Sequence, residues 1–243
     1  MTNSTAKTAP NTTETVLVLD FGAQYGQLIA RRVRDLKVYS EIVPCDTPAE
    51  EIAAKKPAAL ILSGGPASVY AEDAPSVDPG VFELGIPVLG FCYGQQIMAT
   101  TLGGSVGHTE KGEYGPAPLT RCDGTDGVPA SALLGDTPAE QTVWMSHRDA
   151  VSEVPEGFVV TSKTDVCPVS SMECAERKLY ATQFHPEVLH TQEGKTMLSN
   201  FVYEICECSG DWKMDSFVEN NVKALRERIG EGKGLCALSG GVD

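Results

Sequence analysis

The sequence lacks three features that would point to particular classes of protein. It contains no C-x-x-C pair, no excess of basic residues and no apolar run near the length of about 20 residues that spans a bilayer. Its 33 acidic residues outnumber its 19 basic residues, giving a formal net charge of −14, which argues against binding a nucleic-acid backbone. We therefore expect no membrane partner and no nucleic-acid partner.

The N-terminal stretch also lacks the apolar core of a secretory signal. Residues 1–14 are polar and rich in threonine and asparagine, so we predict a disordered tail. In a chain of this size without a signal peptide, the eight cysteines are expected to be reduced thiols in a cytoplasmic protein. Cys206 and Cys208 lie at the end of an amphipathic helical pattern, and we expect no metal site there or elsewhere.

What the sequence does contain is a series of short apolar runs, each followed by a glycine-containing loop. These runs occupy residues 16–19, 59–62 and 86–89, and a helical pattern separates the first two. Nearly continuous apolar strands that alternate with helices are typical of a parallel α/β sheet. Ligands of such sheets bind at the carboxyl ends of the strands.

The pattern changes between about residues 114 and 184. Short β-like segments at 142–145, 158–162 and 179–184 are separated by proline and glycine turns. An amphipathic helix is predicted over 192–206, and a second helix follows a break at 209–211. We therefore predict an α/β fold with a mostly parallel central sheet flanked by helices, and an added smaller mixed or antiparallel sheet.

The third apolar run ends in Gly90-Phe91-Cys92-Tyr93-Gly94, just before a helical pattern. Glycines on either side of a nucleophilic residue indicate a nucleophile elbow, a sharp turn from strand to helix. The N-terminus of the following helix would stabilise a thiolate at Cys92. On its own the pattern also fits a buried cysteine that only packs in the core.

A cysteine nucleophile needs a base, and the base needs an orienting partner. Of the four histidines, His108, His147 and His190 show no obvious base geometry in the sequence. His185 follows a predicted strand and precedes Pro186 and Glu187. In an extended segment, residues two apart project to the same side, so Glu187 can fix the tautomer of His185. The alternative is a surface histidine beside an unrelated acid.

Acyl transfer also needs hydrogen-bond donors for the oxyanion that develops. The backbone N–H of Tyr93 comes with the elbow, and a second donor could come from the Gly64-Gly65 loop. Without side chains, this loop lets the backbone approach a ligand. An ordinary turn is the alternative interpretation of the loop.

The given sequence ends in a pattern that is typical of phosphate-binding loops. Residues 234–238 have the pattern of a buried strand, and Ser239, Gly240, Gly241 and Asp243 form a glycine-rich loop. Such loops cradle phosphate at the start of a helix. Because the sequence stops there, we expect the chain to be the front part of a longer protein.

Three ordered motifs together carry a family resemblance. Residues 90–96, residues 63–66 (Ser-Gly-Gly-Pro) and residues 184–187 (Phe-His-Pro-Glu) resemble the class I, or triad, glutamine amidotransferases. The resemblance implies a flavodoxin-like fold over residues 15–208. It implies that Cys92 attacks L-glutamine to form a γ-glutamyl thioester, that His185 transfers protons and that Glu187 orients His185.

The resemblance also implies the remaining site residues and the absence of a cofactor for glutamine hydrolysis. The N–H groups of Gly65 and Tyr93 would hold the oxyanion. Gln96 would contact the substrate, and backbone at Ser146, His147, Arg148 and Asp149 would hold its α-amino and carboxylate groups. Arg148 stands where the family often has glycine; if this position requires a positive φ, arginine costs about 1 kcal/mol there.

Further motifs are similar to the branch of this family that supplies ammonia for GMP synthesis. They lie at residues 20–25, 31–34, 144–147 and 185–191. In that branch a second domain uses ATP and Mg²⁺ to activate xanthosine monophosphate. Residues 209–243 would then be a linker and the truncated start of this ATP pyrophosphatase domain, which is the expected partner of residues 15–208. We also expect a homodimer formed through regions beyond this chain.

Three other functions stay open at this point. The first is the glutaminase domain of another triad amidotransferase, against which the loop at 239–243 argues. The second is a non-catalytic regulatory or ammonia-routing module of the same fold, against which the complete Cys–His–Glu set argues. The third is a cysteine hydrolase that acts on γ-glutamyl peptides.

Overall fold

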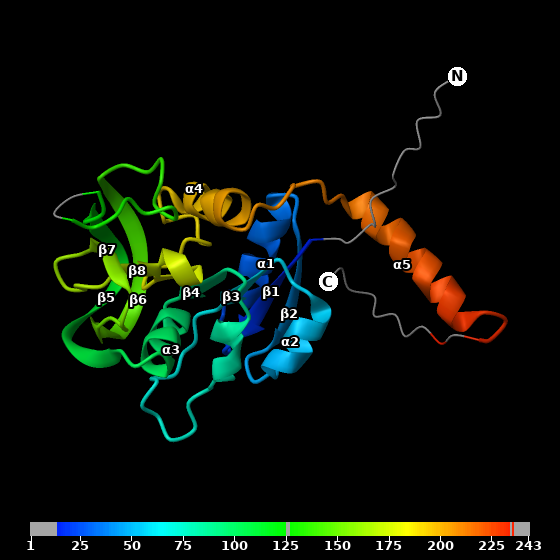
Figure 1. The fold of residues 1–243 in the computed structure, drawn as a ribbon, viewed down its shortest axis with the longest axis horizontal. Helices are drawn as coiled ribbons and strands as arrows, with labels where there is room; N and C mark the ends of the chain where they lie inside the picture. Colours follow the sequence, from blue (N-terminus) through cyan, green and yellow to red (C-terminus); the bar gives the residue numbers. More distant parts are fainter. Residues whose placement is uncertain (1–13, 125–126, 234, 236–243) are drawn as a thin grey trace.

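The computed structural model describes residues 14–124, 127–233 and 235. Within these residues, nine strands form one continuous sheet in the order β2-β1-β3-β4-β9-β8-β7-β5-β6 (Figure 1). The strands are β1 (Thr15–Asp20), β2 (Tyr39–Pro44), β3 (Ala59–Leu62), β4 (Val88–Phe91), β5 (Ser105–Arg121), β6 (Glu140–Glu153), β7 (Val159–Lys163), β8 (Ser171–Cys174) and β9 (Leu179–Thr182).

The helices connect these strands and cover the sheet. The α-helices are α1 (Gly26–Asp35), α2 (Ala49–Lys55), α3 (Tyr93–Thr101), α4 (Gly194–Ser199) and α5 (Met214–Ile229). Two 3₁₀ helices, η1 (Pro79–Glu83) and η2 (Ala175–Arg177), and a π-helix, η3 (Asn200–Ile205), complete the secondary structure of the described residues.

Strands β2, β1, β3, β4 and β9 pair in parallel, as the apolar runs predict. Successive side chains of β1 alternate between the two faces of the sheet. Val16 and Val18 pack in a core with residues of α1 and α4, whereas Leu17 and Leu19 pack in a second core with residues of α2 and α3. Both faces of the parallel strands are therefore buried.

The pairing of β4 with β9 brings the segments that contain Cys92 and His185 to the same edge of the sheet. Phe91 lies opposite Thr182 in a parallel register, and the Cys92 N–H donates to the Thr182 carbonyl oxygen at 2.8 Å. The residues that follow the two strands must therefore emerge at the same edge of the sheet. These residues are Cys92 on one strand and the segment leading to His185 on the other.

The predicted antiparallel region continues the same sheet through β8, which pairs with β9. Strands β8, β7, β5 and β6 are antiparallel to their neighbours. Strands β5 and β6 form the longest pairing of this antiparallel part of the sheet, and their register shifts between His108 and Glu113. The sequence predicts segments of β6, β7 and β9 but does not predict β5 or β8.

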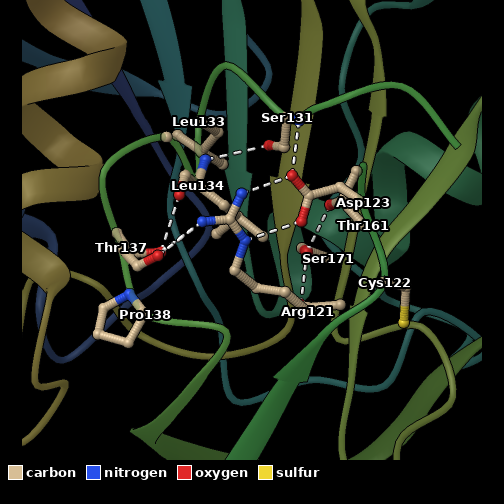
Figure 2. A network of polar contacts seen from close by, with 12 residues as sticks. Arg121, Cys122, Asp123, Ser131, Leu133, Leu134, Thr137, Pro138, Thr161 and Ser171 are labelled. Carbon is tan, nitrogen blue, oxygen red and sulfur yellow. Dashed lines mark hydrogen bonds and ion pairs between the residues drawn. The ribbon is translucent and has the colours of Figure 1, made fainter. Parts of the chain in front are cut away.

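A polar network fastens the connection between β5 and β6 to the sheet (Figure 2). The Arg121 guanidinium donates to both carboxylate oxygens of Asp123, at 2.8 and 2.6 Å, and to the Thr137 carbonyl oxygen at 2.7 Å. Asp123 also accepts from the Ser131 N–H at 2.8 Å. Burial opposes the charge of Asp123, but these hydrogen bonds outweigh it and lower its pKa.

The predicted helix over 192–206 exists, but its second half is not α-helical. Helix α4 passes into the π-helix η3, where the Cys206 N–H donates to the Phe201 carbonyl oxygen at 2.9 Å. The predicted apolar stripe is buried at Met197, Leu198, Phe201 and Val202. A π-turn inserts an extra residue without changing the apolar character of the stripe, so the sequence pattern could not reveal it.

The segment between η3 and α5 carries no regular structure, in agreement with the predicted break at 209–211. The Trp212 N–H donates to the Lys37 carbonyl oxygen at 2.9 Å, which ties this segment to the sheet domain. Helix α5 then extends away from the sheet (Figure 1). Residues 1–13 of the predicted tail at 1–14, the strand pattern at 234–238 apart from 235, and Ser239, Gly240, Gly241 and Asp243 lie outside the described residues. Among the described helices, none combines the length and apolar character needed to cross a membrane.

Candidate active site

Cys92 occupies the turn between β4 and α3 in a strained backbone conformation. Its φ is +51° and its ψ is −104°, a region that residues with a side chain rarely adopt. A Cβ on Gly90 would lie 2.6 Å from the Gly94 backbone, and a Cβ on Gly94 would lie 2.4 Å from the Leu62 carbonyl oxygen. The turn is therefore so tight that both flanking positions require glycine, as the elbow motif predicts.

His185 and Glu187 form a buried pair beyond the end of β9. The Nδ1 atom of His185 lies 2.8 Å from Oε1 of Glu187, and both side chains are more than nine-tenths buried. Among the described residues, no partner reaches the second carboxylate oxygen, Oε2. Because β9 ends at Thr182, His185 follows a bend at 183–184 and Glu187 lies in a turn, so the pair is not part of a continuous extended strand as the sequence predicts. The predicted contact nevertheless forms.

Two further residues fix this pair from the α1 side. The Arg32 Nε donates to the Glu187 carbonyl oxygen at 2.9 Å. The ring of Tyr25 meets the His185 ring edge-on, with 5.8 Å between the ring centroids. The His185 ring is therefore held by its carboxylate partner and by an aromatic neighbour.

Cys92 and His185 converge beside Gly64. A Cβ on Gly64 would lie 3.2 Å from Cε1 of His185 and 3.6 Å from Cβ of Cys92. Cys92, His185 and Glu187 line one cavity of about 230 Å³, together with the Gly64-Gly65 loop. The structure thus brings together the three residues that the sequence predicts as nucleophile, base and orienting acid.

The charges in this cluster favour a protonated His185. Burial alone would lower its pKa, but Glu187 and Cys92 outweigh burial and raise the pKa of His185 to about 10. An imidazolium between a carboxylate and a cysteine sulfur stabilises the thiolate form of that sulfur. The arrangement can therefore prepare a nucleophile and hold the proton that a leaving group needs.

This shift predicts that His185 stabilises the fold less at high pH. Its folded-state pKa lies above the value near 6.5 of an unfolded chain, so its contribution is fully present below about pH 6.5 and is lost as pH rises through about 10. We expect the difference in urea midpoint between the wild-type chain and His185→Gln to shrink over this range. A difference that does not change with pH would contradict the raised pKa.

The predicted oxyanion donors lie next to each other. Tyr93 is the first residue of α3, where backbone N–H groups have no partner within the helix. A Cβ on Gly65 would lie 3.4 Å from Cγ of Tyr93 and 2.8 Å from the Phe21 carbonyl oxygen. The loop therefore approaches the elbow as closely as a residue without a side chain allows. Gly65, Cys92 and Tyr93 line a common pocket.

This second pocket, of about 480 Å³, also holds the predicted substrate-binding residues. The Gln96 Nε2 donates to the Asp149 carbonyl oxygen at 2.6 Å, which joins α3 to β6. The Cys92 Sγ lies 3.6 Å from the Ser146 carbonyl oxygen. The pocket is lined by Gln96, Ser146, His147, Arg148 and Asp149. Cys92 lines both this pocket and the cavity that contains His185.

Arg148 lines this pocket without backbone strain. Arg148 belongs to β6 and does not have a positive φ, in contrast to Cys92. Its side chain is exposed, and its carbonyl oxygen accepts from the Thr109 hydroxyl at 2.7 Å. Arginine in place of the usual glycine therefore imposes no left-handed conformation here.

Ser68, His108 and Tyr114 also line this pocket, although the sequence does not single them out as site residues. The Ser68 hydroxyl donates to Oδ2 of Asp149 at 2.6 Å, and Nδ1 of His108 lies 2.8 Å from Oδ1. Burial opposes the charge of Asp149, but these two contacts outweigh it and lower its pKa. No local pattern around residues 68 or 108 signals these contacts. They depend on the approach of the loop containing Ser68 to β6 and on the register that sets His108 of β5 opposite Asp149.

The comparisons with known proteins agree with this geometry. Residues 17–205 match the family model of glutamine amidotransferase class-I. Proteins named GMP synthase [glutamine-hydrolyzing] from Thermobifida fusca and Streptomyces coelicolor are 54% and 53% identical over 240 residues, which is 99% of this chain. The matched region is 44% and 45% of those proteins, so the chain spans less than half the length of these curated relatives.

Solved structures show the same fold. A candidate GMP synthase component from Thermoplasma acidophilum superposes with a TM-score of 0.67 at 28% identity, covering 86% of this chain and 98% of its own. A glutamine amidotransferase from Thermotoga maritima gives a TM-score of 0.61 at 19% identity, covering 81% of this chain and 99% of its own. The second likeness concerns the fold alone.

Proposed function

The chain belongs to the class-I glutamine amidotransferase family, and we propose that it hydrolyses L-glutamine to glutamate and ammonia through a thioester on Cys92. The observation that carries this proposal is the strained elbow of Cys92 beside a buried His185–Glu187 pair. Strain of this kind persists where the surrounding structure enforces it and is concentrated at active sites. A cysteine that only packs in the core has no need of it.

In the proposed reaction, the thiolate of Cys92 attacks the side-chain amide carbon of glutamine. The oxyanion that forms accepts hydrogen bonds from the N–H groups of Gly65 and Tyr93. His185 gives its proton to the departing nitrogen, which leaves as ammonia. His185 then takes a proton from water, which attacks the thioester and releases glutamate and the Cys92 thiolate.

The larger of the two pockets that Cys92 lines suits the remainder of the substrate. We assign the α-amino and carboxylate groups of glutamine to the wall formed by residues 146–149, with Gln96 contacting the substrate from α3. The pocket places backbone and side-chain polar groups of these residues around one concave surface next to Cys92. Polar groups that converge in a pocket fix the orientation of a small ligand.

We further propose that the ammonia serves GMP synthesis from xanthosine monophosphate and ATP, within cytoplasmic purine biosynthesis. The support is the name shared by relatives that match almost the whole chain. ATP and Mg²⁺ would act in a second, ATP pyrophosphatase domain, to which Ser239, Gly240, Gly241 and Asp243 would contribute the pyrophosphate loop. The glutaminase step itself would need no cofactor. A homodimer would form through that second domain.

We expect the chain alone to hydrolyse glutamine slowly, because an amidotransferase gains nothing from ammonia released without an acceptor. A coupled glutamate assay on the 243-residue chain and on a full-length protein carrying the same domain would test this. The full-length protein, with ATP and xanthosine monophosphate, should exceed the chain alone by at least about tenfold in kcat, a difference of about 1.4 kcal/mol in the barrier. Equal rates would contradict coupling between the domains.

Replacing Glu187 by glutamine should slow turnover while leaving the nucleophile in place. The amide cannot stabilise an imidazolium as a carboxylate does, so we expect kcat to fall by about 10²- to 10⁴-fold with little change in KM. Glu176→Gln changes an exposed glutamate outside the pockets of Cys92 and is the matched control. A rate within about twofold of wild type would remove Glu187 from the orienting role.

A further inference from the structure

Glu113, His147 and Cys167 come together from three separate segments beside the substrate pocket. Glu113 on β5 lies directly opposite His147 on β6 in the antiparallel register. Cys167 is fully buried in the connection between β7 and β8. One carboxylate oxygen, one imidazole nitrogen and the sulfur all lie within 4.8 Å of one another. A carboxylate, an imidazole and a thiol are the groups that bind zinc in proteins.

The imidazole of His147 lies between two hydrogen-bond acceptors. Its Nδ1 is 3.2 Å from the Asp149 carbonyl oxygen, and its Nε2 is 3.1 Å from Oε2 of Glu113. A carbonyl oxygen can only accept, so Nδ1 carries the hydrogen of a neutral ring. The lone pair of Nε2 then faces the carboxylate, and a positive centre must lie between them. That centre can be a proton or a metal ion.

The surrounding hydrogen bonds orient the ligands as in known metal sites. A histidine that binds a metal usually donates its other ring N–H to a carbonyl or carboxylate oxygen, as Nδ1 of His147 does toward Asp149. The Thr164 hydroxyl donates to Oε1 of Glu113 at 2.8 Å and accepts from the Cys167 N–H at 2.9 Å. One threonine therefore connects two of the candidate ligands.

We propose that Glu113, His147 and Cys167 are the protein ligands of a divalent transition-metal site of the zinc class. The charges balance: a thiolate, a carboxylate and a neutral imidazole cancel the two positive charges of the ion. Binding releases two protons, one from Cys167 and one from the His147–Glu113 pair. Nothing in the sequence spacing indicates this site, because the three residues lie far apart along the chain.

Geometry and access both permit an ion of this size. Tetrahedral bonds of about 2.0–2.3 Å place ligand atoms about 3.3–3.8 Å apart, so the group needs to contract by about 1 Å from its present 4.8 Å limit. His147 lines the substrate pocket, but its side chain is only 1% exposed, so an ion and a water ligand for the fourth position would enter from that pocket through a local opening. Burial raises the pKa of the Cys167 thiol to about 12, and a bound cation would offset this cost by stabilising the thiolate.

Cobalt(II) provides a readout that does not depend on activity. It replaces zinc in tetrahedral sites and, with a thiolate ligand, gives a charge-transfer band in the near ultraviolet and strong visible bands. The titration should use a Cys92→Ala background, because Cys92 and His185 together could also bind the ion. We expect both sets of bands to saturate at one Co²⁺ per chain and to disappear when one equivalent of Zn²⁺ is added.

Variants then identify the ligands. Cys167→Ser should lose the charge-transfer band, and Glu113→Gln should weaken Co²⁺ binding by roughly tenfold or more. Cys174→Ser, which changes another buried cysteine, should keep both bands. Circular dichroism establishes that each variant is folded. Absence of the bands in the Cys92→Ala chain, or their persistence in folded Cys167→Ser, would overturn the metal site and leave a proton as the centre between His147 and Glu113.

Discussion

Cys92→Ala should abolish glutamine hydrolysis while leaving the fold intact. Removing a catalytic nucleophile typically costs on the order of 10⁴- to 10⁶-fold in kcat, because no other group can form the covalent intermediate. Alanine also adopts the strained turn with a smaller side chain than cysteine, so the elbow should not collapse. Glutamate release by the purified variant, measured over hours, should not exceed the blank.

The matched control is Cys174→Ala, because Cys174 is also a buried free cysteine but lies on β8, away from the pockets that Cys92 lines. Its glutaminase rate should stay within about threefold of the wild-type chain, as expected for a residue that does not touch the reacting atoms. Near-ultraviolet circular dichroism compares the packing of the two variants. Hydrolysis by folded Cys92→Ala at the wild-type rate would remove Cys92 from the nucleophile role.

Gly94→Ala should have the largest effect on stability. The added methyl carbon would lie 2.4 Å from the Leu62 carbonyl oxygen and 2.8 Å from Leu62 Cβ, and both belong to the buried strand β3. Neither can move as the end of a flexible side chain can, so α3 must shift away from the sheet. We expect a loss of about 3 kcal/mol in the free energy of unfolding, measured by urea titration.

The same shift should impair catalysis, because α3 begins directly after Cys92. A displacement of about 1 Å at a reacting group can cost about 10²-fold in rate. Gly107→Ala is the matched control: its methyl carbon would lie 3.6 Å from the Ser152 side chain, which is an ordinary contact. Equal stability of Gly94→Ala and Gly107→Ala would contradict the close packing at the elbow.

The sequence predicts that Cys92, His185 and Glu187 come together because each part of this cluster has a local signature. Gly90 is required by its contact with the backbone of Gly94, four residues on. Gly94 is required by its contact with Leu62 of the neighbouring strand β3. The contact of His185 with Glu187 spans two residues, so their spacing alone limits the geometry. The parallel strands are equally evident, since their apolar runs end where the functional loops begin.

The rest of the site depends on contacts between distant segments, which leave no local pattern. Asp149 is held by Ser68 and His108, which lie 81 and 41 residues away along the chain. Nothing in the sequence indicates that His147 meets Glu113, yet the register of β5 and β6 places the two residues opposite each other. The pairing of β5 with β6 changes register between His108 and Glu113. The turn residues of the sequence do not reveal where such a shift occurs.

The most direct test of the account is to trap the intermediate on Cys92. The wild-type chain is mixed with glutamine, quenched in acid within one turnover, digested and analysed by mass spectrometry. We predict a γ-glutamyl group on the peptide that contains Cys92, absent from Cys92→Ala and lost when the mixture stands before quenching. Glutamate formation without any such adduct, or an adduct on a different cysteine, would contradict a thioester mechanism at the elbow.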